Sequence, residues 1–310
     1  MAGTEFDRGV RPGPHTIAFS LFRDRFTELN AVYWSSVPAF AHLQATMARH
    51  SDAELLPSVV GHTSDDSRRY CWTLGVAREQ QKLSERWMRM STVVGMAGAL
   101  EVYLGRVCRL AVLSDPIGSP GWPKLLDGAV LLKAGRPWQY SSDVFVTGTW
   151  ERRLTEYRTA FGSVSPRVEG AASELQKLQN LRNGVAHRMG RDARPADSLQ
   201  ERMSDAEPTG VSQKRLKAWF GMVMEVASEV DSHLSEQFIG AFEYIELFHH
   251  WHRNPADVAR RFGVPVASHR LVPGHMHALT GGKWPWTVEY LNSRYVRGLE
   301  SYYKALPRRF

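Results

Sequence analysis

Cysteine is scarce in this sequence, which has two among 310 residues, Cys71 and Cys108. Two thiols cannot build a disulfide framework, and their positions match no zinc-site spacing. The histidines from His249 to His277 likewise come with no cysteine or paired acid at metal-site spacing. We therefore expect buried, reduced thiols in a cytoplasmic protein, with no metal and no other cofactor.

Long hydrophobic runs are also lacking, although 43% of the residues are hydrophobic. No segment approaches the roughly 18 uninterrupted apolar residues that a membrane span requires. The first eight residues are polar and include two acids, unlike the start of a secretory signal. The sequence thus predicts one or two globular domains with a sizeable core and no membrane partner.

The net charge of +7 lies in the last fifth of the chain. Residues 253–310 contain ten basic residues and three acidic ones, a difference of seven. Aromatic residues alternate with basic ones there: Trp284, Trp286, Tyr290, Tyr295, Tyr302 and Tyr303. This composition suits either a surface that binds a polyanion and stacks bases or a solvated basic face with aromatics packed in a core.

Apolar residues recur at helical spacing through most of the chain, which predicts an all-α fold. Residues 1–15 hold three glycines and two prolines and are predicted to be a flexible leader. Cys71 and Cys108 both fall within the strongest helical stretch, Arg69–Val112. The expected helices cover Thr16–Arg49 with a break or kink at Pro38, Arg69–Val112 as one helix or two, a short run near Leu125–Leu132, Trp150–Phe161, a helix from Pro166 into the 180s, Ser212–Leu234 and Phe238–Trp251.

One stretch concentrates side chains suited to phosphate chemistry: Arg182, Asn183 and His187. Arginine offers a planar, permanently charged fork, histidine exchanges a proton near neutral pH, and asparagine hydrogen-bonds to a phosphate or a base edge. On an α-helix Asn183 and His187 share a face, whereas Arg182 and His187 point ~140° apart. The reach of Arg182, a distortion at Gly184, or a second copy of the motif across a two-fold axis would bring them together.

The string from Arg182 to His187 resembles the Arg-Asn-x-x-x-His motif of the HEPN superfamily, helical bundles that include many metal-independent ribonucleases. The resemblance covers roughly residues 85–236. Leu100–Leu104 is similar to the early bundle helix, Trp150–Phe161 to the run that leads into the motif, and Ser212–Leu234 to the closing helix. It implies an up-and-down bundle at 69–236, between an N-terminal leader and helical layer at 1–68 and a basic helical extension at 237–310.

The resemblance implies a metal-independent endoribonuclease of the bacterial toxin or antiphage-defence type, acting as a homodimer on RNA, with an antitoxin or defence-complex partner. Arg182, Asn183 and His187 would be catalytic, and Glu101 would orient Arg182 or His187. Arg188, Arg191 and Arg194 would hold the RNA backbone.

Each of these assignments has a plainer alternative. Arg182, Asn183 and His187 also suit a helix end that satisfies buried carbonyls, Glu101 a surface carboxylate, and the three downstream arginines a solvated loop. The second function that fits the sequence is a non-catalytic RNA-binding or scaffold subunit of a defence or toxin–antitoxin complex.

Overall fold

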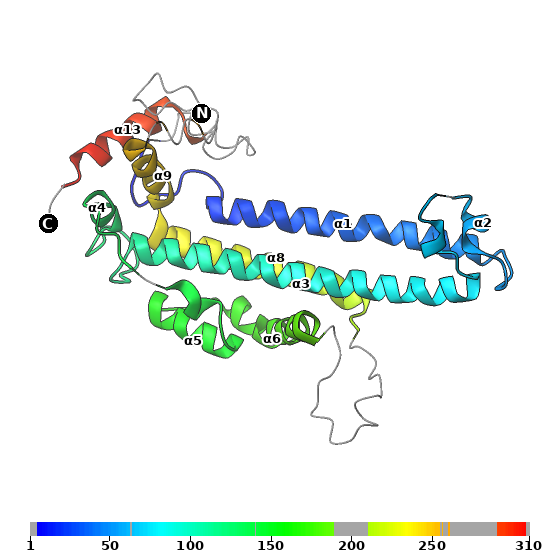
Figure 1. The fold of residues 1–310 in the computed structure, drawn as a ribbon. Helices are drawn as coiled ribbons and strands as arrows, with labels where there is room; N and C mark the ends of the chain where they lie inside the picture. The colour runs from blue at the N-terminus through cyan, green and yellow to red at the C-terminus, as the bar shows by residue number, and fades with distance from the viewer. Residues whose placement is uncertain are drawn as a thin grey trace. The chain divides into compact units, whose positions relative to one another are not determined.

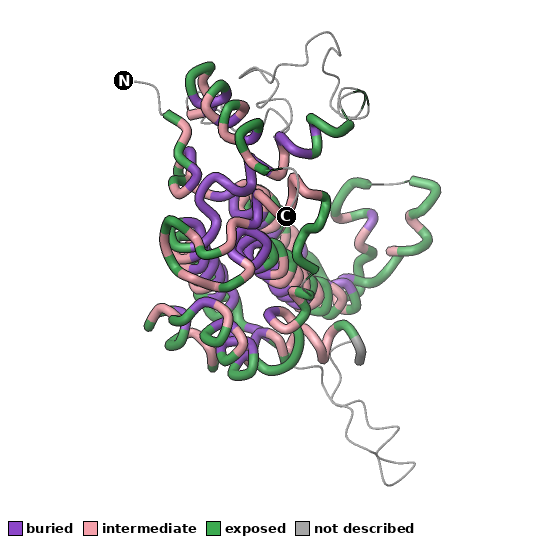
Figure 2. Tube along the Cα trace, turned by 90° about the vertical axis from the view of Figure 1, so that its left-hand side faces the viewer, coloured by how far each residue is buried: buried purple, intermediate pink, exposed green. Residues whose placement is uncertain are grey.

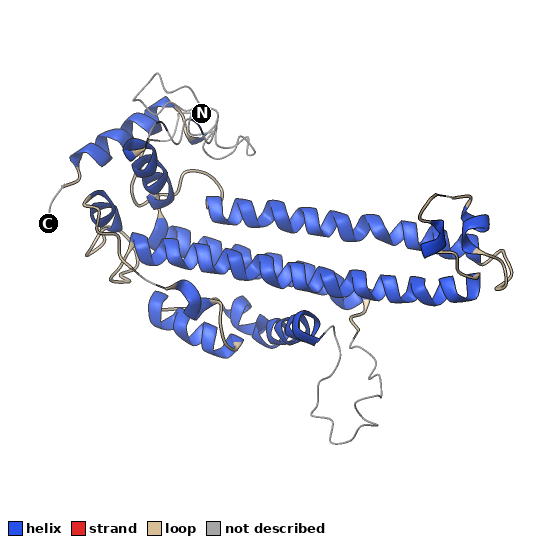
Figure 3. Cartoon of the chain, viewed as in Figure 1, coloured by secondary structure: helices blue, strands red, loops and turns tan. Residues whose placement is uncertain are grey.

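The computed structural model describes residues 5–62, 64–139, 141–188, 210–254, 256, 260 and 290–307. Throughout these ranges the regular structure is helical, apart from one isolated bridge between Leu55 and Thr73 (Figure 3). The predicted all-α fold is confirmed. The principal α-helices are α1 (Ile17–Met47), α2 (Leu56–Val60), α3 (Leu74–Ser114), α4 (Gly128–Lys133), α5 (Trp150–Phe161), α6 (Pro166–Arg188), α8 (Gln213–Leu234), α9 (Phe242–Arg253) and α13 (Ser293–Ala305) (Figure 1).

Local signals in the sequence set where these helices begin and end. Helix α3 contains no proline and stops at Ser114, just before Asp115 and Pro116. Ser212 Oγ caps α8 by accepting a hydrogen bond from the backbone N–H of Arg215 at 3.2 Å. Gly162 ends α5 with φ of 79°, a backbone conformation that favours glycine.

Two helices differ from the prediction in form. Helix α1 passes through Pro38 as one 31-residue helix. The run predicted to start at Phe238 begins instead with a π-helical turn, Ser235–Ile239, and α9 starts at Phe242 after Gly240, whose φ is 52°. A Cβ on Gly240 would lie 2.4 Å from the carbonyl oxygen of Arg8, so only glycine fits this close approach.

The chain divides into two compact units. Unit 1 consists of residues 1–22, 100–172 and 225–310, and unit 2 of residues 23–99 and 173–224. Each unit draws on separate stretches of sequence because α1, α3, α6 and α8 all run through both. The expected division into three consecutive segments, at 68/69 and 236/237, stays a prediction.

Unit 1 is fastened by polar groups that lie inside it. Arg8 is 3% exposed and pairs with Asp127 at 2.8 Å, while it also donates to the carbonyl of Ile239 and to Ser114 Oγ, each at 2.8 Å. Its guanidinium lies over the ring of Phe242. The prediction that the leader is flexible is therefore wrong for its described part, because a buried arginine with these partners holds residues near position 8 in place.

The C-terminal helix α13 packs with α9 in unit 1. Tyr295, Leu299 and Tyr303 are buried, and Lys133 Nζ donates to the carbonyl oxygens of Tyr303, Lys304 and Leu306 at the end of α13. Tyr295 and Tyr303 thus pack in the core, which agrees with the alternative of a solvated basic face with buried aromatic residues. Trp284 and Trp286 lie outside the described residues.

In unit 2, α1 and α3 run alongside each other (Figure 1). A Cβ on Gly95 would lie 3.1 Å from Leu29 Cδ1, so glycine lets the two helices approach closely. Phe220 of α8 completes the core with edge-on ring contacts to Phe26 at 5.3 Å. Buried positions recur along these helices, as the amphipathic pattern predicts. Figure 2 shows buried and exposed positions interspersed along the Cα trace.

The two thiols have different environments. Cys108 is buried in α3, as predicted, whereas Cys71 is exposed. The prediction that Cys71 is buried is wrong, because α3 begins at Leu74 and not at Arg69, which leaves Cys71 in the short segment before the helix. Among the helices of the described ranges, none is both long and apolar enough to cross a bilayer.

Candidate functional site

The motif residues lie near the end of α6, which is continuous from Pro166 to Arg188. The helix passes Gly184 without a break, so no distortion there draws Arg182 and His187 together. Position 187 is consequently turned ~140° from Arg182 about the helix axis. Of the three ways in which these residues could meet, the reach of Arg182 and a second copy of the motif remain.

Arg182 lies on the same face of α6 as the buried residues Leu175 and Leu178. Leu175 is 0% and Leu178 1% exposed, and Arg182 follows them by seven and four residues. Seven residues at ~100° each place Arg182 within ~20° of Leu175 about the helix axis. The side chain of Arg182 is half-buried as a result.

The guanidinium of Arg182 fixes the neighbouring amide. Nη1 of Arg182 donates to Oδ1 of Asn183 at 2.9 Å. Because a guanidinium only donates, the amide oxygen must be the atom that faces it. The two N–H groups of Asn183 are thereby turned away from Arg182, where they can donate to another acceptor such as a phosphate oxygen.

Glu174 ties α6 to α8 two turns before the motif. It accepts hydrogen bonds from Trp219 Nε1 at 3.0 Å and from Arg215 Nη2 at 3.2 Å, both on α8. A third bond comes from Lys177 at 2.6 Å, and it is the largest of the contributions that lower the pKa of Glu174 to about 2. The carboxylate therefore stays charged at any physiological pH and keeps α6 in register with α8.

The surface of α6 at Gly184 is open. A Cβ built there meets no described atom within 4 Å. Of the two residues that follow, Val185 is half-buried and Ala186 is exposed. A phosphate backbone or a second copy of the helix can approach the motif closely at this point.

The other residues predicted for this site lie partly or wholly outside the described residues. His187 and Arg188 belong to α6, but their side chains lie outside the described residues, as do Arg191 and Arg194 entirely. Their roles stay predictions.

Glu101 has a partner that the sequence did not indicate. Its Oε1 accepts a hydrogen bond from Arg153 Nη2 at 3.2 Å. The Arg153 side chain is 4% exposed and its guanidinium lies 5.1 Å from the ring centroid of Trp150. The carboxylate of Glu101 thus compensates the buried positive charge of Arg153 in unit 1. Its predicted action on Arg182 or His187 is untested.

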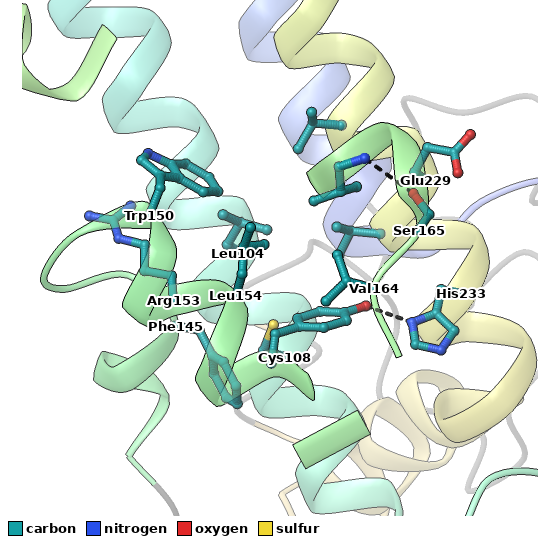
Figure 4. A pocket seen from close by; sticks show the side chains of 14 residues that line it. Leu104, Cys108, Phe145, Trp150, Arg153, Leu154, Val164, Ser165, Glu229 and His233 are labelled. Atoms are coloured by element: carbon teal, nitrogen blue, oxygen red, sulfur yellow. Dashed lines mark hydrogen bonds between the residues drawn. The ribbon is translucent and has the colours of Figure 1, made fainter. Parts of the chain in front are cut away.

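A separate cavity in unit 1 lies among α3, α5, the start of α6 and α8 (Figure 4). Its walls are mainly apolar, with Leu104, Phe145 and Leu154 among them. Its polar centre is a 2.8 Å hydrogen bond between the Tyr157 hydroxyl and His233 Nδ1 (Figure 4).

Burial governs the titration of the polar groups in this cavity. It raises the pKa of the Cys108 thiol and that of the Tyr157 phenol far above their ordinary values, and it lowers the pKa of His233. All three groups are therefore neutral near pH 7. A neutral thiol is a poor nucleophile and a poor metal ligand, so this cavity suits packing or an apolar guest better than covalent chemistry.

Within the described ranges, no three or more His, Cys, Asp or Glu side chains are grouped so that they could hold a metal ion. Comparison of the chain with models of known protein families, with curated proteins and with solved structures finds no match. The likeness to HEPN proteins accordingly rests on the residues of the motif and its flanking helices.

Proposed function

We propose that this protein is a metal-independent endoribonuclease of the HEPN type, in which Arg182, Asn183 and His187 act on an RNA phosphodiester. The observation that carries the proposal is the hydrogen bond from Arg182 to Asn183 near the end of an unbroken α6. It presents a guanidinium and two amide N–H groups side by side next to the open surface at Gly184. These are the donors that phosphate oxygens require.

The chemistry assigned to these residues needs no other group. The substrate's 2′-hydroxyl loses its proton to a histidine and attacks the adjacent phosphorus, while Arg182 and Asn183 stabilise the charge that develops on the phosphoryl oxygens. The bond to the 5′ oxygen then breaks, and that oxygen takes up a proton. The products carry a 2′,3′-cyclic phosphate on one fragment and a 5′-hydroxyl on the other.

The geometry of α6 supports a dimeric site. Arg182 and position 187 lie on faces ~140° apart on a straight helix, so one copy presents them poorly to one phosphate. A two-fold axis beside Gly184 would set Arg182 of one copy against His187 of a second copy. Such an enzyme fits a toxin or antiphage-defence effector that a partner protein holds inactive until it is needed.

The test is cleavage of a labelled mixed RNA pool in excess EDTA, with His187→Ala as the comparison. We expect the wild-type protein to cleave, the products to end in 2′,3′-cyclic phosphate, and the variant to lose at least about 100-fold in rate, the range for general acid–base catalysis. The variant should keep the melting temperature and the RNA affinity of the wild type.

A second candidate is a non-catalytic RNA-binding or scaffold subunit, because Arg182 shares the inward stripe of α6 with Leu175 and Leu178 and so also contributes to packing. Cleavage that is absent in EDTA and in magnesium alike, together with retained RNA binding, would establish this second function. Cleavage that requires magnesium, or that survives His187→Ala, would contradict the mechanism proposed above.

A further inference from the structure

Unit 2 contains a second cavity, bordered by α1, α3 and the first residue of α8. Its volume is about 170 Å³. A cavity of roughly 150 Å³ holds a benzene ring, so this one has room for a molecule of that size or slightly larger. Neither the motif on α6 nor the cavity in unit 1 shares a lining residue with it.

Two opposite charges line the cavity side by side. Arg89 Nη1 lies 3.7 Å from Glu85 Oε2, one helical turn away on α3, and the two side chains are 24% and 32% exposed. At that distance the two charges attract each other but are not joined by a hydrogen bond. Of the described residues that line the cavity, no other is charged. Each charge therefore keeps hydrogen-bonding capacity for a molecule in the cavity.

Buried neighbours hold both charged groups in place. Gln81, which is 7% exposed, donates from Nε2 to Glu85 Oε1 at 3.1 Å and to the carbonyl oxygen of Phe40 at 2.8 Å, so it links α3 to α1. Burial raises the pKa of the Tyr33 phenol, and the charge of Arg89 and a hydrogen bond with it oppose that rise. The Nε of Arg89 is buried and has no acceptor in the described part of the chain. The protein by itself thus leaves this guanidinium short of one hydrogen bond.

Apolar side chains make up another part of the wall. Val37, Phe40 and Ala41 line the cavity from adjoining turns of α1, and Met88 lines it from α3. Phe40 and Met88 are half-buried, so each still has surface that a ligand can cover. The cavity therefore offers one charge of each sign together with apolar surface for an aliphatic chain.

The paired charges decide which class of small molecule fits. Glu85 repels an anion that has no positive group, and Arg89 repels a cation that has no negative group. An apolar guest would leave both charges desolvated without a partner. A free α-amino acid carries its carboxylate and its ammonium on the same carbon atom, so it can pair with Arg89 and Glu85 at the same time.

We infer that this cavity binds a free α-amino acid with an aliphatic side chain. The carboxylate pairs with Arg89, the ammonium pairs with Glu85, and the aliphatic chain packs against Val37 and Phe40. This binding involves no nucleic acid and is independent of whether the α6 motif cleaves RNA.

The experiment is calorimetry on the full-length wild-type protein with valine, leucine, isoleucine and methionine. Each amino acid is compared with two analogues, the amine that lacks its carboxylate and the acid that lacks its ammonium. Three variants alter the site: Arg89→Met, Glu85→Gln, and Ala41→Trp, which fills the space from an exposed position that lines it. Lys82→Met and Glu79→Gln break an exposed ion pair of α3 that does not line the cavity, and they serve as matched controls.

We expect at least one of the four amino acids to bind the wild-type protein. Arg89→Met and Glu85→Gln should each weaken this binding by about 10-fold or more, the size expected for loss of one charged hydrogen bond. Ala41→Trp should weaken it at least as much, because the indole ring occupies the space. Both controls should bind like the wild type.

The charge pairing also predicts two gains in affinity. The acid analogue should bind Glu85→Gln more tightly than it binds the wild type, and the amine analogue should bind Arg89→Met more tightly, because in each case the repelling charge is gone. A pair that served only to stabilise α3 would produce neither gain.

Three results would overturn the inference. In the first, none of the four amino acids binds the wild-type protein. In the second, an analogue that lacks one charge binds as tightly as its parent amino acid. In the third, Ala41→Trp leaves binding unchanged and keeps the wild-type melting temperature. Because Ala41 is exposed, this variant tests the site even if Arg89→Met fails to fold. None of these results bears on the ribonuclease proposal, which the EDTA assay tests separately.

Discussion

Arg182 Nη1 donates to Oδ1 of Asn183 at 2.9 Å, and this bond joins two consecutive residues whose side chains lie on adjacent faces of α6. Its consequence is that the amide of Asn183 has one orientation. In the proposed mechanism Arg182 would therefore act on a phosphate in two ways, through its own charge and through the donors of Asn183.

This relationship predicts different outcomes for two substitutions of Arg182. Arg182→Ala should abolish cleavage and weaken RNA binding, because the charge contacts the phosphate before and during reaction. Arg182→Lys should restore binding in part but not cleavage, since an ammonium cannot reproduce the planar fork that holds both the phosphate and Asn183. Steady-state kinetics and anisotropy give the two readouts, and thermal melting checks the fold. Full activity in Arg182→Lys would contradict the assigned role.

Mixing two inactive variants tests the dimeric site. If each site combines Arg182 of one copy with His187 of a second copy, a dimer of Arg182→Ala with His187→Ala holds one intact site and one doubly substituted site. After exchange of subunits about half of the dimers are mixed, so activity should return to about a quarter of the wild-type value. Activity that stays at the level of the separate variants, in samples proven to be mixed dimers, would place both residues of a site on one chain.

The basic tail predicts a change in salt dependence. Arg294, Arg297 and Lys304 are exposed on α13, and replacing all three with Gln leaves the buried Tyr295 and Leu299 in place. If the three cations contact a single-stranded backbone, the slope of log affinity against log salt should become shallower by about 2, at roughly 0.7 per contact. An unchanged slope would show a solvated basic face. Truncation is a poorer test because it removes core residues.

The buried carboxyl of Glu243 predicts a pH dependence of stability. Burial raises its pKa from 4.5 to about 8, despite hydrogen bonds from the backbone N–H groups of Ile17 and Ala18 at the start of α1. The folded protein therefore keeps a proton that the unfolded chain loses, so this contribution is full below pH 4.5 and is lost as the pH rises towards 8.

Replacement of Glu243 by Gln should remove this dependence. The stability of Glu243→Gln relative to the wild type should rise between pH 5 and pH 8 by on the order of a few kcal/mol. Urea unfolding at several pH values measures it, with Glu151→Gln, an exposed position on α5, as the control that should leave the dependence unchanged. The opposite sign would mean that the N–H groups of α1 outweigh burial.

Two ion pairs of unit 1 predict a contrast in stability. Arg8→Ala leaves Asp127, which is 12% exposed, beside a buried hole and should lower the free energy of unfolding by about 3–5 kcal/mol. Arg294→Ala breaks a pair with Glu5 whose side chains are 59% and 72% exposed, and should cost about 0–1 kcal/mol. Chemical denaturation of the two variants measures the difference. Equal effects would contradict the view that Arg8 fastens the leader.

The sequence alone determined that the fold is helical, where several helices begin or end, and where Arg182 and Asn183 lie on α6. Pro116 after Ser114, the cap at Ser212 and the glycine at position 162 act on the backbone within a few residues, so their effects follow from local chemistry. The alignment of Arg182 with Leu175 also follows from helical period, given that Gly184 does not break the helix.

Only the tertiary structure decided which polar groups are buried and what they meet. Local sequence places Arg8 in a Gly- and Pro-rich leader. Its partners Ser114, Asp127 and Ile239 are all more than 100 residues from it in the sequence. In unit 2 a cavity is lined by Ser36 of α1, Arg89 of α3 and Gln213 of α8, which are far apart in the sequence. Burial and pairing of this kind depend on long-range packing, which no local period or capping signal records.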